Sequence, residues 1–351
     1  MSKKEIRAMI DEIDSQILEL LSQRAGYAKK TAKFKKYYYD PVREREVFDR
    51  LLEENPGPLK SEHVEAIYRE IMSACRGLQS PISVAFLGPR ATFSHQAVIS
   101  RFGNSIIEEP CPDIASVFDA VEKDVTNYGV VPFENSTEGV INYTLDRFSM
   151  TSIRICGEIY ADIALNLISK QKDIKDIKKI FTHPKAMEQC AGWLQRNASG
   201  KEIIQMESTG LAAQRAAKSR NGGAIASLIA AEIYGLNVLE QRVEDYKDNK
   251  TRFLVIGKQK MPNTGRDKTS VLFSVRHEPG TLYRALKSFE EFGLNLTMMQ
   301  ARPSRKSPWE YVFFVDLKGH ETDEEVKKAI QKMKKETLVL KVIGSYPMSE
   351  R

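Results

Sequence analysis

Thr251 and Arg252 stand at the start of a short apolar run. They follow the turn-forming stretch Asp248–Lys250 and precede four apolar residues, Phe253–Ile256. An apolar run bounded by turn formers predicts an interior strand, and α/β folds place ligands at strand ends. The hydroxyl of Thr251 is therefore a candidate hydrogen-bond donor to a ligand. The alternative is that Thr251 only caps the strand.

Two further polar stretches follow predicted strands. The first, LGPRATFS at 87–94, lies between a strand and a helix, where backbone N–H groups and hydroxyls can hold an anion. It lacks the Gly-Lys-Ser/Thr of a nucleotide-binding P-loop. The second, VVPFENSTEG at 130–139, carries polar side chains directly after a strand. Each stretch is also compatible with ordinary turn chemistry, but their shared position at strand ends predicts a common site with Thr251.

A separate set of cations lies in the N-terminal segment. Apolar residues recur every three or four positions over residues 5–36, which predicts a long amphipathic helix. Arg24 and Lys35 are eleven residues, or three turns, apart and share a face of it, whereas Arg7 lies about 25 Å from Arg24 along the axis. If the helices of two chains pair antiparallel, Arg7 of one chain approaches Arg24 and Lys35 of the other. Three cations that converge in this way suit a dicarboxylate. The alternative is that all three are solvated surface charges.

This N-terminal pattern resembles the all-helical family of chorismate mutases. The resemblance covers residues 1–80 and rests on Arg7, Asp14, Arg24, Lys35, Asp40-Pro-Val-Arg43-Glu44 and Gln79. It implies that Arg24 and the Arg7 of a partner chain hold the carboxylates of chorismate, and that Lys35 and Gln79 hydrogen-bond the ether oxygen. It also implies that Glu44 takes the ring hydroxyl while Asp40 and Arg43 complete the pocket wall. Cys75 replaces the family's usual Ser near a substrate carboxylate, so we expect a weaker donor there.

The polar stretches further along resemble the prephenate dehydratase family over about residues 82–260. GPRATFSHQA, GVVPFENSTEG, THPKAMEQCAGWL, ESTGLAA and TRF correspond to the motifs of that family. The resemblance implies that Thr251 is central to catalysis and hydrogen-bonds the hydroxyl that leaves prephenate. We expect Glu134, if desolvated and protonated, to supply a proton, with Asn135 beside it. Thr92, Ser136 and Arg252 are expected to bind the substrate, and Ala91 replaces a usual Gly in a backbone conformation open to Ala.

The C-terminal segment resembles the ACT domain, an amino-acid-binding module. His277–Tyr283 and Gln300–Pro303, followed by Trp309–Asp316, carry the resemblance. It implies that L-phenylalanine binds between paired domains and inhibits the enzyme, through Gly280, Thr281, Leu282, Gln300, Ala301, Arg302 and Pro303. The family's Glu-Ser-Arg-Pro is Gln-Ala-Arg-Pro here and its Gly-Ala-Leu-Val is Gly-Thr-Leu-Tyr, so we expect a weakened or retuned effector site. The alternative is a module for dimerisation only.

Three sequence patterns predict the elements that position these residues. Residues 1–80 carry three helices, and the small core of this all-α chorismate mutase domain makes a helical dimer the expectation. Residues 81–260, the dehydratase domain, alternate short β-rich runs with helical stretches, which predicts two α/β lobes with mostly parallel sheets. The resemblance makes these lobes periplasmic-binding-protein-like. Residues 268–351 have the order strand, helix, strand, strand, helix, strand of an α+β ferredoxin-like ACT domain.

Length and composition exclude several other classes. With 351 residues, 42% hydrophobic and 28% charged, the chain is typical of a multidomain globular protein. No segment predicts a signal peptide or a membrane span, which favours a cytoplasmic protein without a membrane partner. Four scattered cysteines predict neither a metal site nor a disulfide framework. The net charge of +6 is modest and interspersed with carboxylates, which argues against a nucleic-acid partner.

Together these observations predict a bifunctional enzyme of phenylalanine biosynthesis. It converts chorismate to prephenate by a Claisen rearrangement, and prephenate to phenylpyruvate by a decarboxylating dehydration. We expect no cofactor, because positioned donors suffice for both steps. We also expect L-phenylalanine as effector and a homodimer or a dimer of dimers. The alternative is a non-catalytic sensor, in which the two-lobed domain binds a small anion and the ACT domain reports an amino acid.

Overall fold

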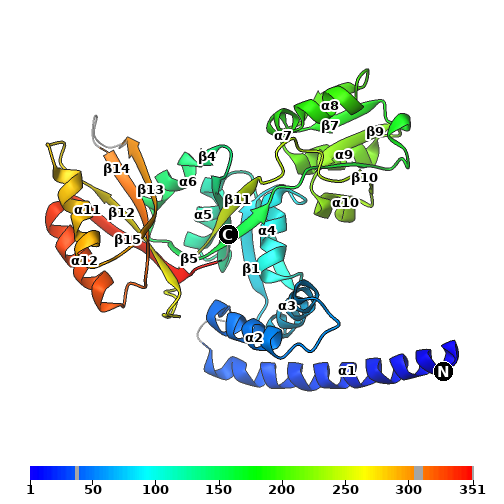
Figure 1. Ribbon diagram of the computed structural model, residues 1–351, viewed down its shortest axis with the longest axis horizontal. Coiled ribbons are helices and arrows are strands. Elements are labelled where there is room, and N and C mark those ends of the chain that lie inside the picture. The colour runs from blue at the N-terminus through cyan, green and yellow to red at the C-terminus, as the bar shows by residue number, and fades with distance from the viewer. Residues whose placement is uncertain (36–38, 304–310, 350–351) are drawn as a thin grey trace. The chain divides into compact units, whose positions relative to one another are not determined.

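A computed structural model describes residues 1–35, 39–303 and 311–349 (Figure 1). The chain divides into two compact units, one of Met1–Val84 with Ile99–Glu108, and one of Ala85–Val98 with Glu109–Arg351. Trp309, which belongs to the C-terminal pattern, lies outside the described residues. None of the described helices is long and apolar enough to cross a membrane.

The N-terminal unit is helical, as predicted. It contains α1 (Lys3–Thr31), the 3-10 helix η1 (Ala32–Phe34), α2 (Pro41–Glu53) and α3 (Ser61–Gly77). A reciprocal capping box between Ser2 and Glu5 starts α1. The helix ends earlier than the sequence predicts, and Lys35 adopts an extended backbone. The expectation that Lys35 lies on one face of a continuous helix is therefore wrong, although its side chain still reaches the same cavity as Arg24.

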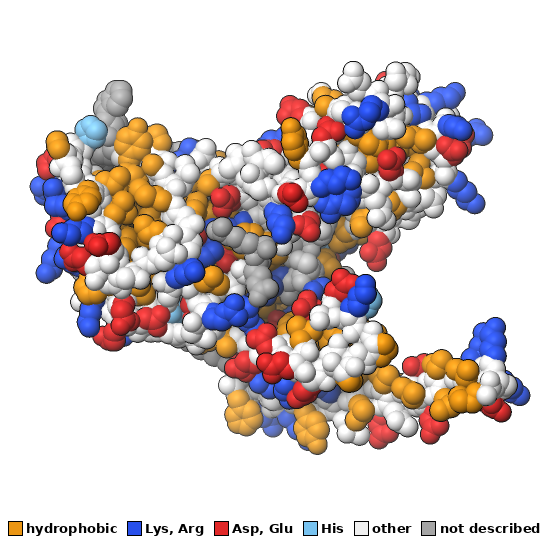
Figure 2. All heavy atoms as spheres, viewed as in Figure 1, with side chains coloured by type: hydrophobic (Ala, Val, Ile, Leu, Met, Phe, Trp, Pro, Cys, Tyr) orange, Lys and Arg blue, Asp and Glu red, His pale blue; other side chains and the backbone are white. Residues whose placement is uncertain are grey.

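Helix α1 carries an apolar stripe that is exposed in the part of the chain that the structure describes. None of its residues is buried, and large apolar side chains along it are exposed (Figure 2). The stripe includes Ile6, Ile10, Ile13, Ile17 and Leu20, each at least 45% exposed. Residues spaced by three and four lie on one face of a helix, so a second apolar surface would bury them together.

The first α/β lobe is built around a sheet with the strand order β2-β1-β3-β11-β5, with β4 paired to β3. Its strands are β1 (Ile82–Leu87), β2 (Ile106–Cys111), β3 (Tyr128–Asn135), β4 (Gly139–Val140), β5 (Arg154–Asp162) and β11 (Lys250–Gly257). Its helices are α4 (Phe93–Phe102), α5 (Ile114–Glu122) and α6 (Asn142–Phe148). The predicted interior strand over Phe253–Ile256 is confirmed as the buried centre of β11.

The second lobe has the strand order β10-β6-β9-β7-β8. Its strands are β6 (Asn166–Ser169), β7 (Lys179–Thr182), β8 (Glu202–Gln205), β9 (Gly222–Ala226) and β10 (Asn237–Glu240). Its helices are η2 (Ile174–Asp176), α7 (Pro184–Gln189), α8 (Ala191–Asn197), α9 (Thr209–Lys218) and α10 (Leu228–Tyr234). Two apolar clusters form its core, one rich in Ala from α9, β9 and α10 and one around Trp193.

Both lobes contain antiparallel strand pairs, which corrects the expectation of mostly parallel sheets. In the second lobe β7 runs parallel to β8 and β9, but β6 runs antiparallel to β9 and β10. In the first lobe β11 runs antiparallel to both β3 and β5. The reason lies in the chain path: the chain leaves the first lobe after β5 and returns to it through β11. The two strands are neighbours that carry the chain in opposite directions, and Lys250 at the start of β11 faces Asp162 at the end of β5.

The C-terminal domain confirms the predicted order of strands and helices. It contains β12 (Asp267–Ser274), α11 (Thr281–Glu291), β13 (Leu296–Pro303), β14 (Tyr311–Lys318), α12 (Glu324–Glu336) and β15 (Val339–Pro347). Its sheet is antiparallel, with the order β13-β14-β12-β15. Apolar side chains from the strands and from both helices form one core, as in a ferredoxin-like domain.

Candidate active sites

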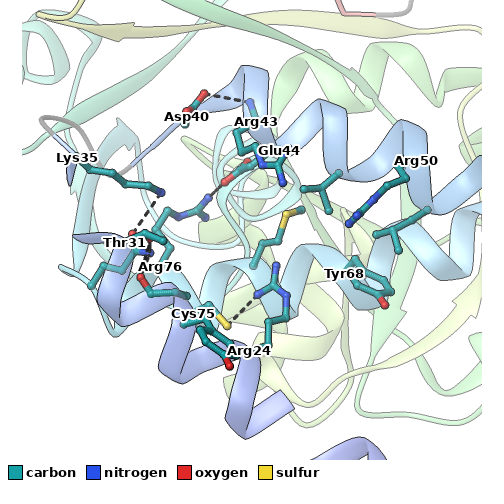
Figure 3. Close-up of a pocket in the computed structure, with 16 residues that line it drawn as sticks. Arg24, Thr31, Lys35, Asp40, Arg43, Glu44, Arg50, Tyr68, Cys75 and Arg76 are labelled. Carbon is teal, nitrogen blue, oxygen red and sulfur yellow. Dashed lines mark hydrogen bonds and ion pairs between the residues drawn. The ribbon is translucent and has the colours of Figure 1, made fainter. Parts of the chain in front are cut away.

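The helical unit contains a cavity of about 430 Å³ lined by charged side chains (Figure 3). The structure brings together seven residues that the sequence singled out: Arg24, Lys35, Asp40, Arg43, Glu44, Cys75 and Gln79. They come from α1, from the segment between α1 and α2, from α2 and α3, and, for Gln79, from just after α3. A cavity with several cations beside apolar side chains suits a compact anion that has more than one negative charge and an apolar ring.

Gln79 and Lys35 form a donor pair at one end of this cavity. The Nζ of Lys35 lies 3.4 Å from the Oε1 of Gln79, whose amide nitrogen donates to the Ala28 carbonyl at 2.7 Å. That carbonyl can only accept, so the amide orientation is fixed with its oxygen toward Lys35. The second amide hydrogen donates to the Thr31 hydroxyl at 3.1 Å, a contact that a ligand in the cavity would have to replace.

Glu44 is paired with a cation that the sequence analysis did not select. Arg76 donates to Glu44, and its side chain is 6% exposed. Burial raises the pKa of the Glu44 carboxyl above its usual value, while the Arg76 guanidinium acts in the opposite direction. Arg76 lies three residues before Gln79 in the sequence, and this spacing was the available signal for the missed residue.

Arg7 does not line the cavity, although it was predicted to serve the same ligand. It lies near the start of α1, whereas Arg24 and the cavity lie near its end. The prediction assigned it to the cavity of a second chain, and that assignment stays a prediction.

A second cavity, of about 400 Å³, lies between the two α/β lobes. Thr92, Asn135 and Thr251 reach it from the first lobe, as predicted, and His183 and Ser208 reach it from the second. Thr251 is 8% exposed and lies opposite Asn135 where β11 pairs with β3. Apolar side chains and neutral hydrogen-bonding groups line most of this cleft, and it has fewer charged residues than the cavity of the helical unit.

The hydrogen bonds of Asn135 determine the direction of the Thr251 hydroxyl. The Oδ1 of Asn135 accepts from the backbone N–H groups of Thr137 and Glu138 at 3.0 and 3.1 Å, which fixes the amide orientation. Its Nδ2 therefore donates to Thr251 Oγ1 at 2.9 Å and to Asn249 Oδ1 at 2.7 Å. Because Thr251 accepts this hydrogen bond, its own hydroxyl hydrogen is available to a ligand in the cleft.

Glu134 and Arg252 depart from the sequence-based expectation. Neither lines the cleft, because each neighbours a cleft residue in its strand and side chains alternate between the faces of a sheet. Arg252 Nη1 lies 4.0 Å from the Glu134 carboxylate, which is 38% exposed. Glu134 is therefore not the desolvated proton donor of the cleft, and the guanidinium of Arg252 is directed away from a substrate there.

Ser136 and Ala91 also differ from their expected roles. The Ser136 hydroxyl does not line the cleft but accepts from the Lys250 backbone N–H at 3.0 Å, and so holds the start of β11. Ala91 has a φ of 69°, in the left-handed region that favours Gly, so its backbone is not one that Ala adopts freely. Its N–H donates to His95 and its carbonyl accepts from Ser227, and these contacts hold the turn.

Comparison with known families matches each part of the chain. Residues 6–80 match the family model of chorismate mutase type II, residues 84–261 that of prephenate dehydratase, and residues 269–334 that of the ACT domain. A bifunctional chorismate mutase/prephenate dehydratase of Aquifex aeolicus is 47% identical over 352 residues, which cover 98% of this chain and 97% of the relative. A protein of the same name from Pseudomonas aeruginosa is 41% identical, with coverages of 98% and 97%.

The chain belongs to the bifunctional chorismate mutase/prephenate dehydratase family.

Two solved structures each match about three quarters of this chain. A prephenate dehydratase of Arthrobacter aurescens in complex with L-Phe is 30% identical, with a TM-score of 0.70 over 76% of this chain and 90% of that one. A structure described as GqqA, a quorum-quenching acylase, also has a TM-score of 0.70, at 26% identity over 76% of this chain and 98% of that one. The shared fold alone does not determine the activity, so the argument rests on the residues of the cleft.

The dehydratase cleft contains ionisable residues that the sequence analysis quoted within motifs but did not select. Lys185 from α7 forms an ion pair with Glu138, which follows β3, and both line the cleft. His183 caps α7 and accepts from the Lys185 N–H at 3.3 Å. Burial and the Lys185 ammonium lower the pKa of His183, so its imidazole is neutral at neutral pH. Their sequence signal was the stretch THPKAMEQC, whose start lies at a strand end.

The ACT domain has a cavity of about 340 Å³ at the start of α11. Gly280, Thr281 and Leu282 line it, as predicted, and Tyr311 and Phe313 add aromatic surface. Gly280 has a φ of 78°, which a residue with a side chain rarely adopts.

The other predicted effector residues lie on β13 and do not line this cavity: Gln300, Ala301, Arg302 and Pro303. Arg302 instead makes two contacts of 3.0 and 2.8 Å with Asp146 of the dehydratase domain. The described residues of this one chain therefore do not unite the two halves of the predicted effector site.

Proposed function

We propose that the two reactions of this family take place in the two cavities described above, in domains bounded at 1–80 and 81–260, with residues 268–351 as the regulatory domain. Chorismate is converted to prephenate in the helical cavity, and prephenate is converted to phenylpyruvate in the cleft. The observation that carries this proposal is that each matched enzyme domain contains its own polar cavity, lined by residues of its family motifs.

The mutase cavity suits a reaction that needs shape and charge but no nucleophile. Arg24 binds one carboxylate of chorismate and holds the substrate in its compact reactive conformer. Lys35 and the Gln79 amide, whose second hydrogen exchanges Thr31 for the substrate, donate to the ether oxygen, where negative charge grows as the bond breaks. Glu44, fixed by Arg76, accepts from the ring hydroxyl, and Asp40 and Arg43 close the wall.

The dehydratase cleft suits the loss of a hydroxyl group from a neutral ring. Prephenate releases CO2, the electrons of that bond aromatise the ring, and the ring hydroxyl leaves as hydroxide that must be protonated to water. Thr251 donates a hydrogen bond to the departing oxygen, because Asn135 already occupies its acceptor side. Thr92 contacts the substrate at the other wall of the first lobe. Glu134 lies on the other face of the sheet, so the proton for the departing hydroxide has to come from another group. The ionisable residues that line the cleft include Glu138, His183, Lys185 and Glu207.

The exposed stripe of α1 supports a homodimer of the mutase domain. An antiparallel pairing of two α1 helices buries both stripes and brings Arg7 of each chain toward the cavity of the other. A mixture of Arg7→Ala and Arg24→Ala chains tests this arrangement. One of the two sites in a mixed dimer keeps both arginines, so the mixture should regain about a quarter of the wild-type mutase activity. If each variant is inactive and the mixture is too, the two arginines act within one chain and the pairing is rejected.

The ACT domain supports L-phenylalanine as effector. Its cavity lies at the N-terminus of α11, a helix of eleven residues, and such a terminus suits a carboxylate. The aromatic surface of the same cavity suits a phenyl ring. A second ACT domain would have to supply Gln300–Pro303, and this requires dimers to pair at that end as well. Calorimetry with L-phenylalanine tests the site, and the absence of binding would leave the domain a dimerisation module.

Incubation with chorismate separates the enzyme from the alternative of a non-catalytic sensor. The proposal predicts that chorismate disappears and phenylpyruvate forms, with prephenate as a transient. Accumulation of prephenate would refute the assignment of the cleft, and unchanged chorismate would refute that of the helical cavity. Both cavities retain the hydrogen-bond donors that the two reactions need, whereas a sensor needs only to bind its ligand. This disfavours the sensor.

A further inference from the structure

The guanidinium of Arg252 lies in a buried cluster between the dehydratase sheet and the ACT sheet. Its Nε lies 2.8 Å from the carboxylate of Glu158 on β5, and its Nη2 lies 2.7 Å from that of Asp316 on β14. The same Nη2 donates to the Tyr346 hydroxyl at 3.0 Å. Lys268 donates to both oxygens of the Glu158 carboxylate, at 2.7 Å to the oxygen that Arg252 also contacts and at 3.0 Å to the other. The four charged side chains are at most 3% exposed.

Each strand of the ACT sheet contributes a side chain to this cluster. Lys268 comes from β12, Asp316 from β14 and Tyr346 from β15, while the Met298 sulfur on β13 lies 3.9 Å from Arg252. Two cations and two carboxylates balance each other, which is the condition for burying charges at all. Burial alone would lower the pKa of Arg252, but Tyr346 and the two carboxylates raise it, so the guanidinium stays charged. Removing any one partner would leave an uncompensated buried charge.

This cluster is attached directly to the residue assigned to catalysis. Arg252 and Thr251 are consecutive in β11 and face opposite sides of the sheet, so fixing one side chain sets the direction of the other. The pairing of β11 with β3 is irregular between Arg252 and Phe253. A ladder that shifts register at this point constrains the backbone less than a regular one. Regular pairing with β5 holds β11 on its other edge over Lys250–Val255, and the side chain of Arg252 adds a further constraint where the ladder with β3 shifts.

We propose that Arg252 is a positioning residue through which the ACT domain holds Thr251 in its catalytic direction. Arg252 does not contact prephenate. Asp316 and Tyr346 of the ACT sheet bind the Arg252 guanidinium through an ion pair and a hydrogen bond. The dehydratase rate therefore depends on how this sheet packs against β11. The inference rests on the proposed role of Thr251, whereas the mutase reaction does not depend on the cluster.

A double-mutant cycle between Arg252 and Asp316 tests the proposal in the full-length chain. Asp316→Asn keeps the size of the side chain and removes the charge opposite Arg252. Both Arg252→Lys and Asp316→Asn should lower the kcat for prephenate by about tenfold and leave its KM within about twofold, since misplacing a donor slows the chemical step. The double variant should lose no more than the worse single variant, because both changes release the same contact.

Three outcomes of this cycle would overturn the proposal. A raised KM with an unchanged kcat in Arg252→Lys would mean that Arg252 binds prephenate directly. Equal kcat in Asp316→Asn and wild type, or additive losses in the double variant, would mean that the ACT contact does not position Thr251. Arg196→Gln is the matched control, because that exposed arginine also pairs with a carboxylate, at 3.8 Å from Asp245. It should leave both parameters unchanged.

Tyr346→Phe keeps the test decisive if Asp316→Asn does not fold. It deletes only the hydroxyl that accepts from Arg252 and should lower kcat several-fold without raising KM. Wild-type kcat in a folded Tyr346→Phe chain would count against the proposal in the same way. The test separates this inference from the proposed function. An active Thr251→Val chain would refute the assigned role of Thr251. An inactive Thr251→Val chain, together with normal activity of the Arg252 and Asp316 variants, would refute only the coupling between the ACT domain and Thr251.

Discussion

The two proposed active sites of this chain rely on different kinds of side chain. The mutase cavity gathers charged groups from helices, while the dehydratase cleft places a neutral hydroxyl and a neutral amide at the ends of two strands. The difference follows from the reactions. A dianion that must be folded on itself needs fixed cations, whereas a ring that already tends to aromatise needs one donor aimed at its leaving oxygen. Each site should therefore fail in its own way when a single side chain is changed.

Thr251→Val should produce the largest effect. The substitution keeps the shape of the side chain and removes the hydroxyl donor, so dehydratase kcat should fall by about 1,000-fold. Mutase activity of the same chain should not change. Prephenate turnover and chorismate turnover are measured separately on the purified variant.

The control for this variant is Thr337→Val, which removes a hydroxyl bonded within α12 and far along the chain from the cleft. Near-normal turnover by a folded Thr251→Val chain would contradict the assignment of the cleft.

Arg24→Ala should damage only the mutase. Losing a charge-assisted contact to a substrate carboxylate costs about 3 kcal/mol, so kcat/KM for chorismate should fall by about 100-fold. Turnover of added prephenate should stay at the wild-type level. Arg45→Ala serves as the matched variant, because Arg45 also lies in the helical unit and pairs with Asp49 at 3.9 Å without lining the cavity. An equal loss in both variants would show that the effect is not specific to the cavity.

Asn135→Asp should have a smaller effect on the cleft. A carboxylate cannot donate to Thr251 and instead attracts its proton, so the hydroxyl turns away from the leaving group and kcat should fall about tenfold. Asn237→Asp changes an exposed amide of the second lobe in the same way and should leave the rate unchanged. A full-rate Asn135→Asp chain would mean that the amide does not set the direction of the hydroxyl.

Cys75→Ser should produce the smallest change, and it should be a gain. The Arg24 guanidinium now lies 3.0 Å from the Cys75 sulfur, a weak hydrogen-bonding partner. A hydroxyl there is a stronger donor to a substrate carboxylate, so the KM for chorismate should fall about twofold at constant kcat. Cys111→Ser, in the other compact unit, should change neither value. A higher KM in Cys75→Ser would show that the thiol suits the pocket better than a hydroxyl.

The sequence predicted the mutase cavity better than the cleft. The spacing of residues along a helix determines the face on which they lie, independently of tertiary contacts. Lys35 lies beyond the end of α1, but its long side chain still reaches the cavity. Glu134 and Arg252 were misplaced because motif membership was given more weight than the alternation of a strand, which puts neighbours of Asn135 and Thr251 on the other face. The pairing of Arg252 with Asp316 joins residues far apart in the chain, and no local pattern specifies such a contact.

The central claim is that one chain contains two independent active sites, and a mixing experiment tests it most directly. Arg24→Ala and Thr251→Val chains are incubated with chorismate, alone and in equal amounts, and phenylpyruvate is measured. Alone, the first should consume chorismate slowly and the second should accumulate prephenate. The mixture should form phenylpyruvate at about half the wild-type rate, since half of each kind of site is intact. A mixture no faster than the better single variant would contradict the account.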